Sequence, residues 1–430
     1  MTVTYLKKGI KASKQEQREL SKIVKDILDE IENGGEEALR EIAKKFDNWT
    51  GDIEVSNIFI DDAEKSLDNN VKKDIKYAVQ NIKKFAQKQL ESVSSFETEL
   101  RSGLIAGQKL IPVNTVGCYV PGGRYCHIAS GMMTVTTAKV AGVKNIIACT
   151  PPSLNSKAPV KPELLYTLRL CGADRVFAIG GVQAIALMVN GLLSSPPADV
   201  IAGPGNEFVA EAKRQVFGSV GIDMVAGPTN SLIIADKKAD SKLIAWDLIS
   251  QAEHGHNSPV WLITESESLA KQVIEIIPQI LGELPEQNRD NAKKAWDNCG
   301  EVVLCSEKEE ILSLANQIAP EHLHVQCLDL EYWFSNLESY GSLFLGEETT
   351  VSFGDKASGP NHVLPTSGAA RYTGGLSVHK FLKTVTWQKL KQEAVNELAG
   401  VTARISRLEG MEAHAMAADI RINRFKKKYS

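Results

Sequence analysis

Short apolar segments alternate with helical segments from about residue 110 onward, and glycine turns separate them. Residues 140–149 contain a helix end, a glycine and a short apolar run, and residues 172–180 repeat this order. Residues 199–206 and 231–236 add two similar apolar runs. Short apolar strands that alternate with helices are typical of parallel β-α-β units, in which helices cover both faces of a sheet. The pattern therefore predicts an α/β fold.

A second series of the same kind follows the first. We expect further helices at residues 240–253, 266–281, 286–298 and 307–317, and further strands at residues 260–264, 301–305, 322–326 and 342–346. Apolar spacing near the N-terminus predicts helices at 14–47, around Gly34-Gly35, and at 60–95. Residues 350–376 are loop-like, and we expect helix again at 377–399 and about 409–425.

Length and composition limit the kinds of protein that this chain can be. Its 430 residues are too many for one ordinary core, so we expect two large domains. The net charge of −4 gives no general attraction to nucleic acid or to an anionic membrane, and we interpret the basic run at residues 421–428 as a solvated helix end rather than a binding tail. No apolar run is long enough for a membrane span or a signal segment, so we expect a cytoplasmic location. The seven cysteines form no CxxC pair, which favours reduced core residues over disulfides or zinc ligands.

Three glycine turns fall at or near the ends of expected strands, at residues 119–123, 180–183 and 203–206. Backbone amides at a glycine turn before a helix can bind an anion, and ligands of open α/β sheets bind at the carboxyl ends of strands. None of the turns is a GxGxxG motif, and each alone could be a plain turn. Together they favour a nucleotide-type ligand.

Two short segments pair histidine with another polar residue. Gln251 and His254 lie three apart at a helix end, where they share a face and could both bind one cation; the alternative is that His254 caps helix carbonyls. Glu321 and His322 are adjacent at an expected helix-to-strand junction, where an acid and a base could divide proton transfers; the alternative is a solvated junction.

Further candidate ligands lie in the C-terminal part of the chain. Asp355 falls in a polar loop with two glycines, and Glu409 and His414 are about one and a half helical turns apart. An oxygen from Asp355 and imidazoles from His254 and His414 suit zinc, with the Gln251 amide as an uncommon fourth ligand. These segments are too far apart in sequence to form a local metal motif. The residues alone therefore leave the metal site open.

Eight segments of the chain resemble histidinol dehydrogenases, and they occur in the order of that family across about residues 110–425. They are VGCYVPGGRY, GGVQAIALM, IAGPGNEFVAEAKRQVFG, IDMVAGPTNSLIIAD, DLISQAEHG, APEHL, FGDKASGPNHVLPT and EGMEAHA. So many long motifs in order make the resemblance highly specific.

The resemblance implies roles for residues of this chain. The implied zinc ligands are Gln251, His254, Asp355 and His414. The implied acid–base pair is Glu321 and His322. The implied NAD contacts are Tyr119, Gln183 and Asn206. The implied substrate contacts are Thr229, Gln251, His254, His322, Asp355, Glu409 and His414.

The resemblance also implies an architecture. The expected fold is α/β, with two incomplete Rossmann-like α/β/α domains and small helical segments at both ends of the chain. The expected division is a small N-terminal segment at 1–20, a first α/β domain at 21–118 and 231–376 with the zinc and substrate site, a second Rossmann-like domain at 119–230 on the NAD side, and a C-terminal helical segment at 377–430. That last segment would cross to the partner of a homodimer, so that Glu409 and His414 complete the partner's active site.

The implied reaction oxidises a small polar alcohol through an aldehyde to a carboxylate, with one zinc per site and two NAD per turnover. Biosynthetic members usually have GPSE and GDY where this chain has Thr229-Asn230 and Asp355-Lys356. The chain here resembles a side branch that includes sulfopropanediol dehydrogenase, which oxidises 2,3-dihydroxypropane-1-sulfonate to sulfolactate. We therefore expect that substrate, with histidinol as the alternative. Alternatives of other classes are a zinc hydrolase and an inactive metal-binding protein.

Overall fold

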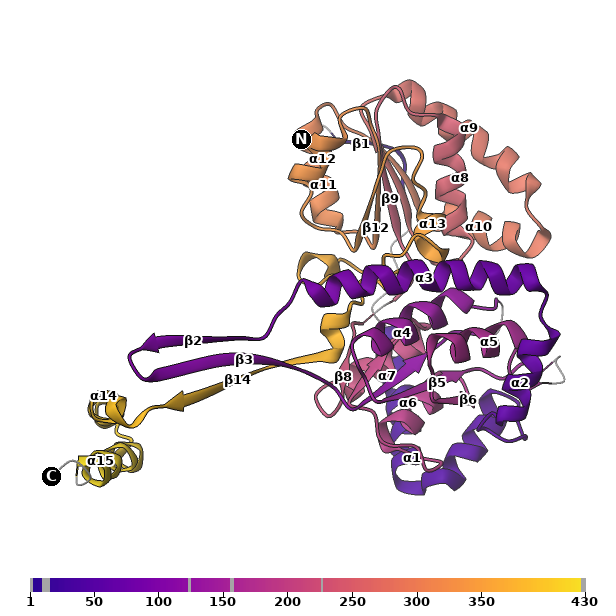
Figure 1. The fold of residues 1–430 in the computed structure, drawn as a ribbon. Coiled ribbons are helices and arrows are strands. Elements are labelled where there is room, and N and C mark those ends of the chain that lie inside the picture. The colour runs from indigo at the N-terminus through magenta and orange to yellow at the C-terminus, as the bar shows by residue number, and fades with distance from the viewer. Residues whose placement is uncertain (1–2, 10–15, 123–124, 155–157, 226, 427–430) are drawn as a thin grey trace. The chain divides into compact units, whose positions relative to one another are not determined.

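The structure is a computed structural model that describes residues 3–9, 16–122, 125–154, 158–225 and 227–426 (Figure 1). The chain divides into two compact units. Unit 1 contains residues 1–90 and 113–381, and unit 2 contains residues 91–112 and 382–430.

Unit 1 contains a five-stranded parallel sheet with the order β6-β5-β4-β7-β8. Its strands are β4 (Thr115–Tyr119), β5 (Asn145–Thr150), β6 (Arg175–Ala178), β7 (Val200–Ala202) and β8 (Gly221–Ile222). The helices that follow its strands are α4 (Ile128–Val140), α5 (Pro162–Cys171), α6 (Gly181–Asn190) and α7 (Glu207–Val216). The strand order reverses between β4 and β7, so the carboxyl ends of these two strands form the switch point where such sheets bind ligands.

A six-stranded sheet of unit 1 has the order β1-β11-β10-β9-β12-β13. Its strands are β1 (Thr4–Lys7), β9 (Ser231–Ala235), β10 (Val260–Thr264), β11 (Gly300–Leu304), β12 (His322–Gln326) and β13 (Ser342–Leu345). Only the pairing of β1 with β11 is antiparallel. The helices between and after these strands are α8 (Ser241–Ala252), α9 (Glu267–Glu283), α10 (Glu286–Cys299), α11 (Lys308–Ile318), α12 (Leu330–Asn336) and α13 (Val351–Lys356). Both sheets confirm the predicted α/β fold, and β10 and β12 have the predicted bounds.

The helices α1 (Glu16–Phe46), α2 (Asn57–Ser66) and α3 (Asn69–Glu91) lie between β1 and the five-stranded sheet in the sequence. α1 is interrupted at Gly35, whose φ of 59° is outside the helical region, which agrees with two helices around this glycine. The predicted domain division placed residues 21–118 in one domain with the sheet at 231–376. α1 instead packs on the five-stranded sheet, because its apolar stripe shares one core with α6 and α7. The other domain boundaries stay a prediction.

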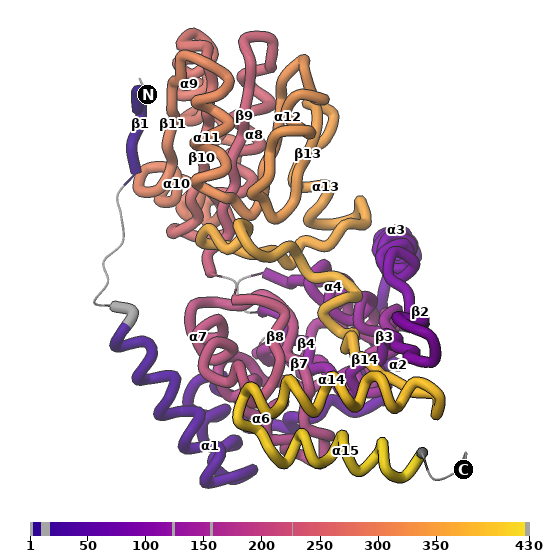
Figure 2. The backbone as a smooth tube through the Cα atoms, turned by 90° about the vertical axis from the view of Figure 1, so that its left-hand side faces the viewer, coloured from indigo at the N-terminus to yellow at the C-terminus, as the bar shows by residue number. Residues whose placement is uncertain are grey.

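Unit 2 consists of a three-stranded antiparallel sheet and a helical hairpin. The strands are β2 (Phe96–Arg101), β3 (Leu104–Pro112) and β14 (Leu382–Leu390), in the order β14-β3-β2. The helices α14 (Val395–Leu408) and α15 (Glu412–Lys426) lie side by side around an alanine-rich core (Figure 2). The predicted helix at 377–399 is wrong over 382–390. There Thr, Val and Trp side chains, which are enriched in strands, pair along the whole length of β3.

All seven cysteines are free, and four of them are buried as predicted for core residues, namely Cys118, Cys149, Cys171 and Cys305. Among the described residues, no helix has both the length and the apolar character that a membrane span needs. The basic run at 421–428 ends α15, although residues 427 and 428 lie outside the described residues.

Candidate active site

Glu321 and His322 lie at the junction between α11 and β12. α11 ends at Ile318, and Ala319 takes a left-handed conformation with φ of 49°, which turns the chain toward the sheet. His322 is the first residue of β12, and the residues Glu321 and His322 are 5% and 3% exposed. The predicted acid–base pair is therefore buried, and the solvated-junction alternative is wrong.

Asn230, which immediately precedes β9, is bonded to both members of the pair. Its backbone N–H donates to Glu321 Oε2 at 3.0 Å, and its side-chain Oδ1 accepts the Glu321 N–H at 2.8 Å. Its carbonyl oxygen accepts the His322 backbone N–H at 3.2 Å and lies 3.3 Å from His322 Nδ1. A carbonyl can only accept, so Nδ1 carries the proton in this contact. In the neutral imidazole, Nε2 is then the basic nitrogen.

Burial and charge shift the titration of this pair. Burial raises the pKa of Glu321 to about 7, although the neighbouring His322 and the bond from Asn230 oppose this shift. Burial by itself would lower the pKa of His322, but the carboxylates of Glu321 and Asp355 outweigh it and raise that pKa to about 9. Both groups therefore titrate in a range where they can exchange protons with a substrate.

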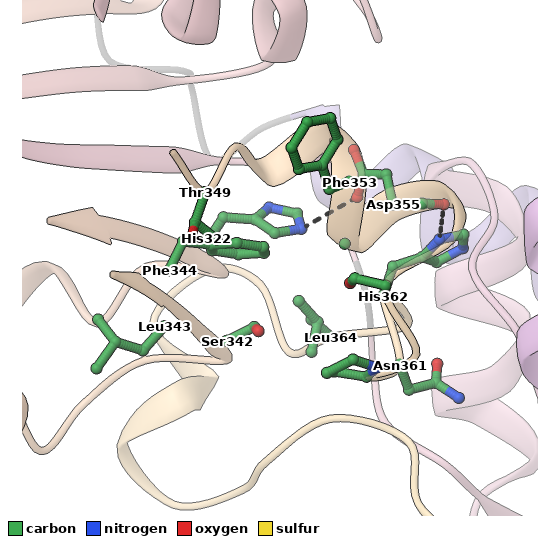
Figure 3. A pocket seen from close by; sticks show the side chains of 13 residues that line it. His322, Ser342, Leu343, Phe344, Thr349, Phe353, Asp355, Asn361, His362 and Leu364 are labelled. Carbon is green, nitrogen blue, oxygen red and sulfur yellow. Dashed lines mark hydrogen bonds and ion pairs between the residues drawn. The ribbon is translucent and has the colours of Figure 1, made fainter. Parts of the chain in front are cut away.

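Asp355 faces the imidazole of His322 from α13. Thr350 caps α13 by accepting the Ser352 N–H, and Asp355 lies in the last turn of this short helix. Asp355 Oδ1 is 3.5 Å from His322 Nε2, and this nitrogen has no hydrogen-bond partner (Figure 3). Burial by itself would raise the pKa of Asp355, but the imidazoles of His254 and His322 hold it well below its usual range. Asp355 is therefore a carboxylate at neutral pH.

Gln251 and His254 approach the other oxygen of the same carboxylate. Gln251 Nε2 donates to Asp355 Oδ2 at 3.1 Å, and His254 Nε2 lies 3.8 Å from that oxygen. Gln251 is buried at the end of α8, and His254 follows two residues after this helix. The Gln251 side chain is thus oriented by Asp355, while its Oε1 atom is buried without a hydrogen-bond partner.

The donor atoms fit a zinc ion on chemical grounds. A buried amide oxygen without a partner costs free energy, and a cation would satisfy it. It lies on a side chain bonded to the ionised Asp355, with the His254 imidazole close to the same carboxylate, and these are oxygen and nitrogen donors that zinc accepts. Among the described residues, no group of three or more His, Cys, Asp or Glu side chains is arranged to hold a metal. The set in unit 1 is therefore two such side chains and one amide.

His362 connects Asp355 to helix α4. Its Nδ1 lies 2.7 Å from the Asp355 carbonyl oxygen, and its Nε2 lies 3.2 Å from Ser130 Oγ on α4. Burial lowers the pKa of His362 to about 4, so the ring is neutral. Nδ1 then donates to the carbonyl and Nε2 accepts from Ser130.

A cavity of about 430 Å³ opens beside His322 and Asp355. Figure 3 shows these two side chains on its wall with His362 nearby. The remaining lining is mixed, with Phe344, Phe353 and several hydroxyl or amide side chains; these polar groups are Ser342, Thr349, Ser358 and Asn361. A small polar alcohol fits a space of this size and lining.

The predicted NAD residues lie at or shortly after the carboxyl ends of strands of the five-stranded sheet. Tyr119 ends β4, and its hydroxyl accepts the Gly181 N–H at 3.1 Å. Gln183, in the first turn of α6, donates to Asp47 Oδ2 at 2.9 Å, and the same oxygen accepts the Gly180 N–H at 3.0 Å. The structure thus joins two of the three predicted turns. In the turn at 119–123, Gly123 lies outside the described residues.

The third turn follows β7 at the switch point. Asn206 caps α7, and its Oδ1 accepts the Val209 N–H at 3.1 Å. Gly203 precedes it with φ of 119°, and a Cβ at this position would collide with the Tyr119 carbonyl oxygen. Glycine is therefore required where β4 and β7 approach each other.

A buried ion pair holds the Gly203 peptide on both sides. Lys213 Nζ donates to the Gly203 carbonyl at 2.8 Å, and Asp223 Oδ2 accepts the Gly203 N–H at 2.7 Å. Lys213 and Asp223 also bond to each other, with side chains 1% and 0% exposed. Both residues lie in segments that resemble the family, but their pairing was not predicted, because nothing in the sequence shows that these two charges are buried together.

The other predicted residues lie away from these contacts. Thr229 is half-buried in the loop before β9, and Lys356 is exposed at the end of α13. Glu409 and His414 belong to unit 2, where both are exposed, and His414 lines an apolar groove of the helical hairpin. Asn230 is buried against Glu321, so it is not free to face a substrate.

The two sheets with their parallel β-α-β units, the switch point and the buried Glu-His pair are those of an α/β enzyme. Comparison with known proteins places it more closely. The family model "Histidinol dehydrogenase" matches residues 10–422. A histidinol dehydrogenase homolog of Ruegeria pomeroyi is 55% identical over 426 residues, which cover 99% of this chain and 98% of that protein. The sulfopropanediol 3-dehydrogenase of Ruegeria pomeroyi is 53% identical over 425 residues, with 99% and 97% covered.

A solved structure agrees with these sequence matches. The crystal structure of histidinol dehydrogenase from Elizabethkingia anophelis matches with a TM-score of 0.88 and 32% identity, over 97% of this chain and 98% of that one. The chain therefore belongs to the histidinol dehydrogenase family, as the resemblance implied. By this membership it is an NAD-dependent dehydrogenase that acts on CH–OH groups, which argues against the zinc hydrolase and the inactive metal-binding protein.

Proposed function

We propose that this enzyme oxidises 2,3-dihydroxypropane-1-sulfonate to sulfolactate, through an aldehyde, at the site formed by Glu321, His322 and Asp355. The observation that carries the chemistry is the unpartnered Nε2 of His322, which faces Asp355 on the wall of the cavity. The observation that favours this substrate is the 53% identity to a sulfopropanediol 3-dehydrogenase.

Gln251, His254 and Asp355, with His414 of a partner subunit, would hold one zinc ion. When bound, zinc would supply a positive charge that anchors and polarises the substrate alcohol. The buried Gln251 Oε1 without a partner supports this set, as does the ionised state of Asp355. The hydrogen bond from Gln251 Nε2 to Asp355 fixes the orientation of the amide and leaves its oxygen without a partner, so that this oxygen can bind the metal.

His322 is the proposed base of the first oxidation. The Asn230 carbonyl holds the Nδ1 proton, so Nε2 can take the hydroxyl proton of the alcohol as its hydride leaves. NAD supplies the hydride acceptor, and Tyr119, Gln183 and Asn206 are its proposed contacts. Hydrogen bonds fix the side chains of all three, so this surface is preorganised.

Glu321 is the proposed base of the second oxidation. Its pKa of about 7 lets the carboxylate take a proton from water at neutral pH, so that the aldehyde becomes a hydrate. The hydrate then loses a second hydride and becomes the carboxylate. Because Glu321 is bonded to Asn230 on one oxygen only, the other oxygen is available for this water.

Lys356 is the residue that we propose to favour an anionic substrate. Burial is the main cause of the lowered pKa values of His127 and of the cavity residue His362, and the charge of Lys356 lowers both further. The ammonium field therefore extends to the cavity, where it attracts a sulfonate and repels cationic histidinol. Histidinol remains the alternative substrate, because the family model and the solved relative carry that name.

The test of the substrate is NADH formation by the zinc-loaded enzyme with dihydroxypropanesulfonate and histidinol side by side. We expect turnover of the sulfonate and a raised KM for it in Lys356→Met, with no change in KM for glycerol as an uncharged control. Turnover of histidinol alone would contradict the proposed substrate and leave the family assignment intact.

We further propose a homodimer in which Glu409 and His414 complete the partner's site as substrate and zinc contacts, with Thr229 as a substrate contact from unit 1. The exposure of Glu409 and His414 in unit 2 supports this. Mixed dimers of Gln251→Ala and His414→Asn chains should recover activity, because one of their two sites has all its ligands. Absence of any recovery would contradict the shared site.

A further inference from the structure

A buried polar network surrounds Asp247, outside the residues with proposed roles. Asp247 Oδ2 accepts the Gln326 side-chain N–H at 2.8 Å, and Asp247 Oδ1 accepts the Thr350 hydroxyl at 2.7 Å. Gln326 Nε2 also donates to His324 Nδ1 at 3.3 Å, and His324 Nε2 lies 2.8 Å from the Gly346 carbonyl. The Asp247 side chain is 13% exposed, and that of His324 is not exposed.

The protonation of His324 follows from these contacts. Burial lowers its pKa, so the ring is neutral. The Gly346 carbonyl can only accept a hydrogen bond, so His324 Nε2 carries the proton. His324 Nδ1 then accepts from the Gln326 amide. The Gln326 amide therefore bridges the imidazole and the Asp247 carboxylate with its two N–H groups.

Asp247 and its two partners belong to the three elements that carry the proposed zinc and catalytic residues of unit 1. Asp247 lies on α8, one turn before Gln251 and on the same face. Gln326 lies on β12, where it shares a face with His322, because side chains alternate along a strand. Thr350 is the N-cap of α13, which carries Asp355.

We infer that Asp247 is a positioning residue that fixes α8, β12 and α13 relative to one another and so preorganises the zinc site. This inference rests on the proposed function of Gln251, His254 and Asp355. A carboxylate suits the position, because it accepts a hydrogen bond on each oxygen from a different element. Residues that support metal ligands from the surrounding structure fix the orientation of those ligands. Removal of such a supporting residue typically weakens metal binding about 10–100-fold.

The test is a titration of the metal-free protein with Co²⁺, which reports affinity and ligand geometry through its visible absorption. Asp247→Leu removes both acceptors, and we expect about 10–100-fold weaker Co²⁺ binding with an altered spectrum. Asp247→Asn keeps one acceptor and should bind Co²⁺ more tightly than Asp247→Leu. Leu248→Ala is the matched control, since it perturbs the buried core face of the same helix. It should lower the melting temperature and leave the affinity and spectrum unchanged.

A second pair of variants keeps the inference testable if Asp247→Leu does not fold. Thr350→Val removes the bond between α13 and Asp247 and should weaken Co²⁺ binding, while Thr350→Ser keeps the hydroxyl and should restore it. Wild-type affinity and spectrum in Asp247→Leu, or an equal loss in Leu248→Ala, would overturn the positioning role alone. No Co²⁺ binding by the wild-type protein would overturn the zinc site and this inference with it.

Discussion

The side-chain oxygen of Asn230 accepts the backbone N–H of Glu321 at 2.8 Å, and the backbone N–H of Asn230 donates to the Glu321 carboxylate at 3.0 Å. These reciprocal bonds fix both the backbone and the side chain of one residue of the acid–base pair. Asn230 is also one of the positions at which this chain differs from the biosynthetic members. Its polar groups contact Glu321 and His322, so we expect Asn230 to affect the reaction through these two residues.

Replacement of Asn230 by Leu should impair the second oxidation more than the first. The buried Glu321 N–H would lose its acceptor, which costs about 1–3 kcal/mol, and the Glu321 backbone would lose the bond that fixes its position, while the backbone N–H of residue 230 still donates to the carboxylate. Product analysis should show aldehyde accumulating at the expense of acid. Asn230→Asp keeps the acceptor and is the control for backbone position. An unchanged ratio of acid to aldehyde in Asn230→Leu would contradict this role.

The rate of the first oxidation should rise with pH up to about 9. The pKa of His322 is raised to about 9, so the ring is protonated below that pH and cannot accept the alcohol proton. kcat/KM should then fall about tenfold for each pH unit below the pKa. Glu321→Gln removes a charge that raises the pKa of His322, so the rise of kcat/KM in this variant should occur at lower pH. A profile that is flat between pH 6 and about 9 would exclude His322 as the base.

The sequence was most informative where local pattern decides structure. Apolar runs bounded by glycines gave the parallel strands, and β10 and β12 lie where they were predicted. The strand β14 was predicted as helix, because its sequence allows either and only the pairing with β3 decides between them. Local helical spacing also paired Gln251 with His254, and both approach Asp355 in the structure.

The partners that adjust the site were not predictable from the sequence. Gln183 is 136 residues from Asp47, and Asn230 is 91 residues from Glu321. Such contacts depend on how whole elements pack, and no residue type or spacing near Asp47 or Asn230 indicates them. The alternation of His322, His324 and Gln326 on one face of β12 was a usable signal, since it predicts a polar stripe inside the sheet.

Loss of the buried cation at Lys213 should destabilise the fold and weaken NAD binding together. Lys213→Met leaves Asp223 buried without its partner, and breaking such a pair costs about 3–5 kcal/mol. Arg214→Met is the control on the same helix, because the Arg214 side chain is 55% exposed and Gln215 still donates to its partner Glu211 after the change, so the loss should be about 0–1 kcal/mol. Denaturant unfolding and the KM for NAD measure both effects. A loss in Arg214→Met as large as that in Lys213→Met would contradict the claim.

Substitution of Gly203 by Ala should disturb the NAD side of the site more than backbone strain alone explains. Gly203 and Gly218 have similar φ angles, 119° and 114°, so alanine is strained at both by about 1–2 kcal/mol. Nothing lies within 4 Å of a Cβ at Gly218, whereas a Cβ at Gly203 meets the Tyr119 backbone. Gly203→Ala must therefore push β4 and the turn before α7 apart, and with them Tyr119 and Asn206. We expect a melting temperature below that of Gly218→Ala and a raised KM for NAD only in Gly203→Ala. If the two variants have the same KM for NAD, the close approach of the two strands does not shape the cofactor site.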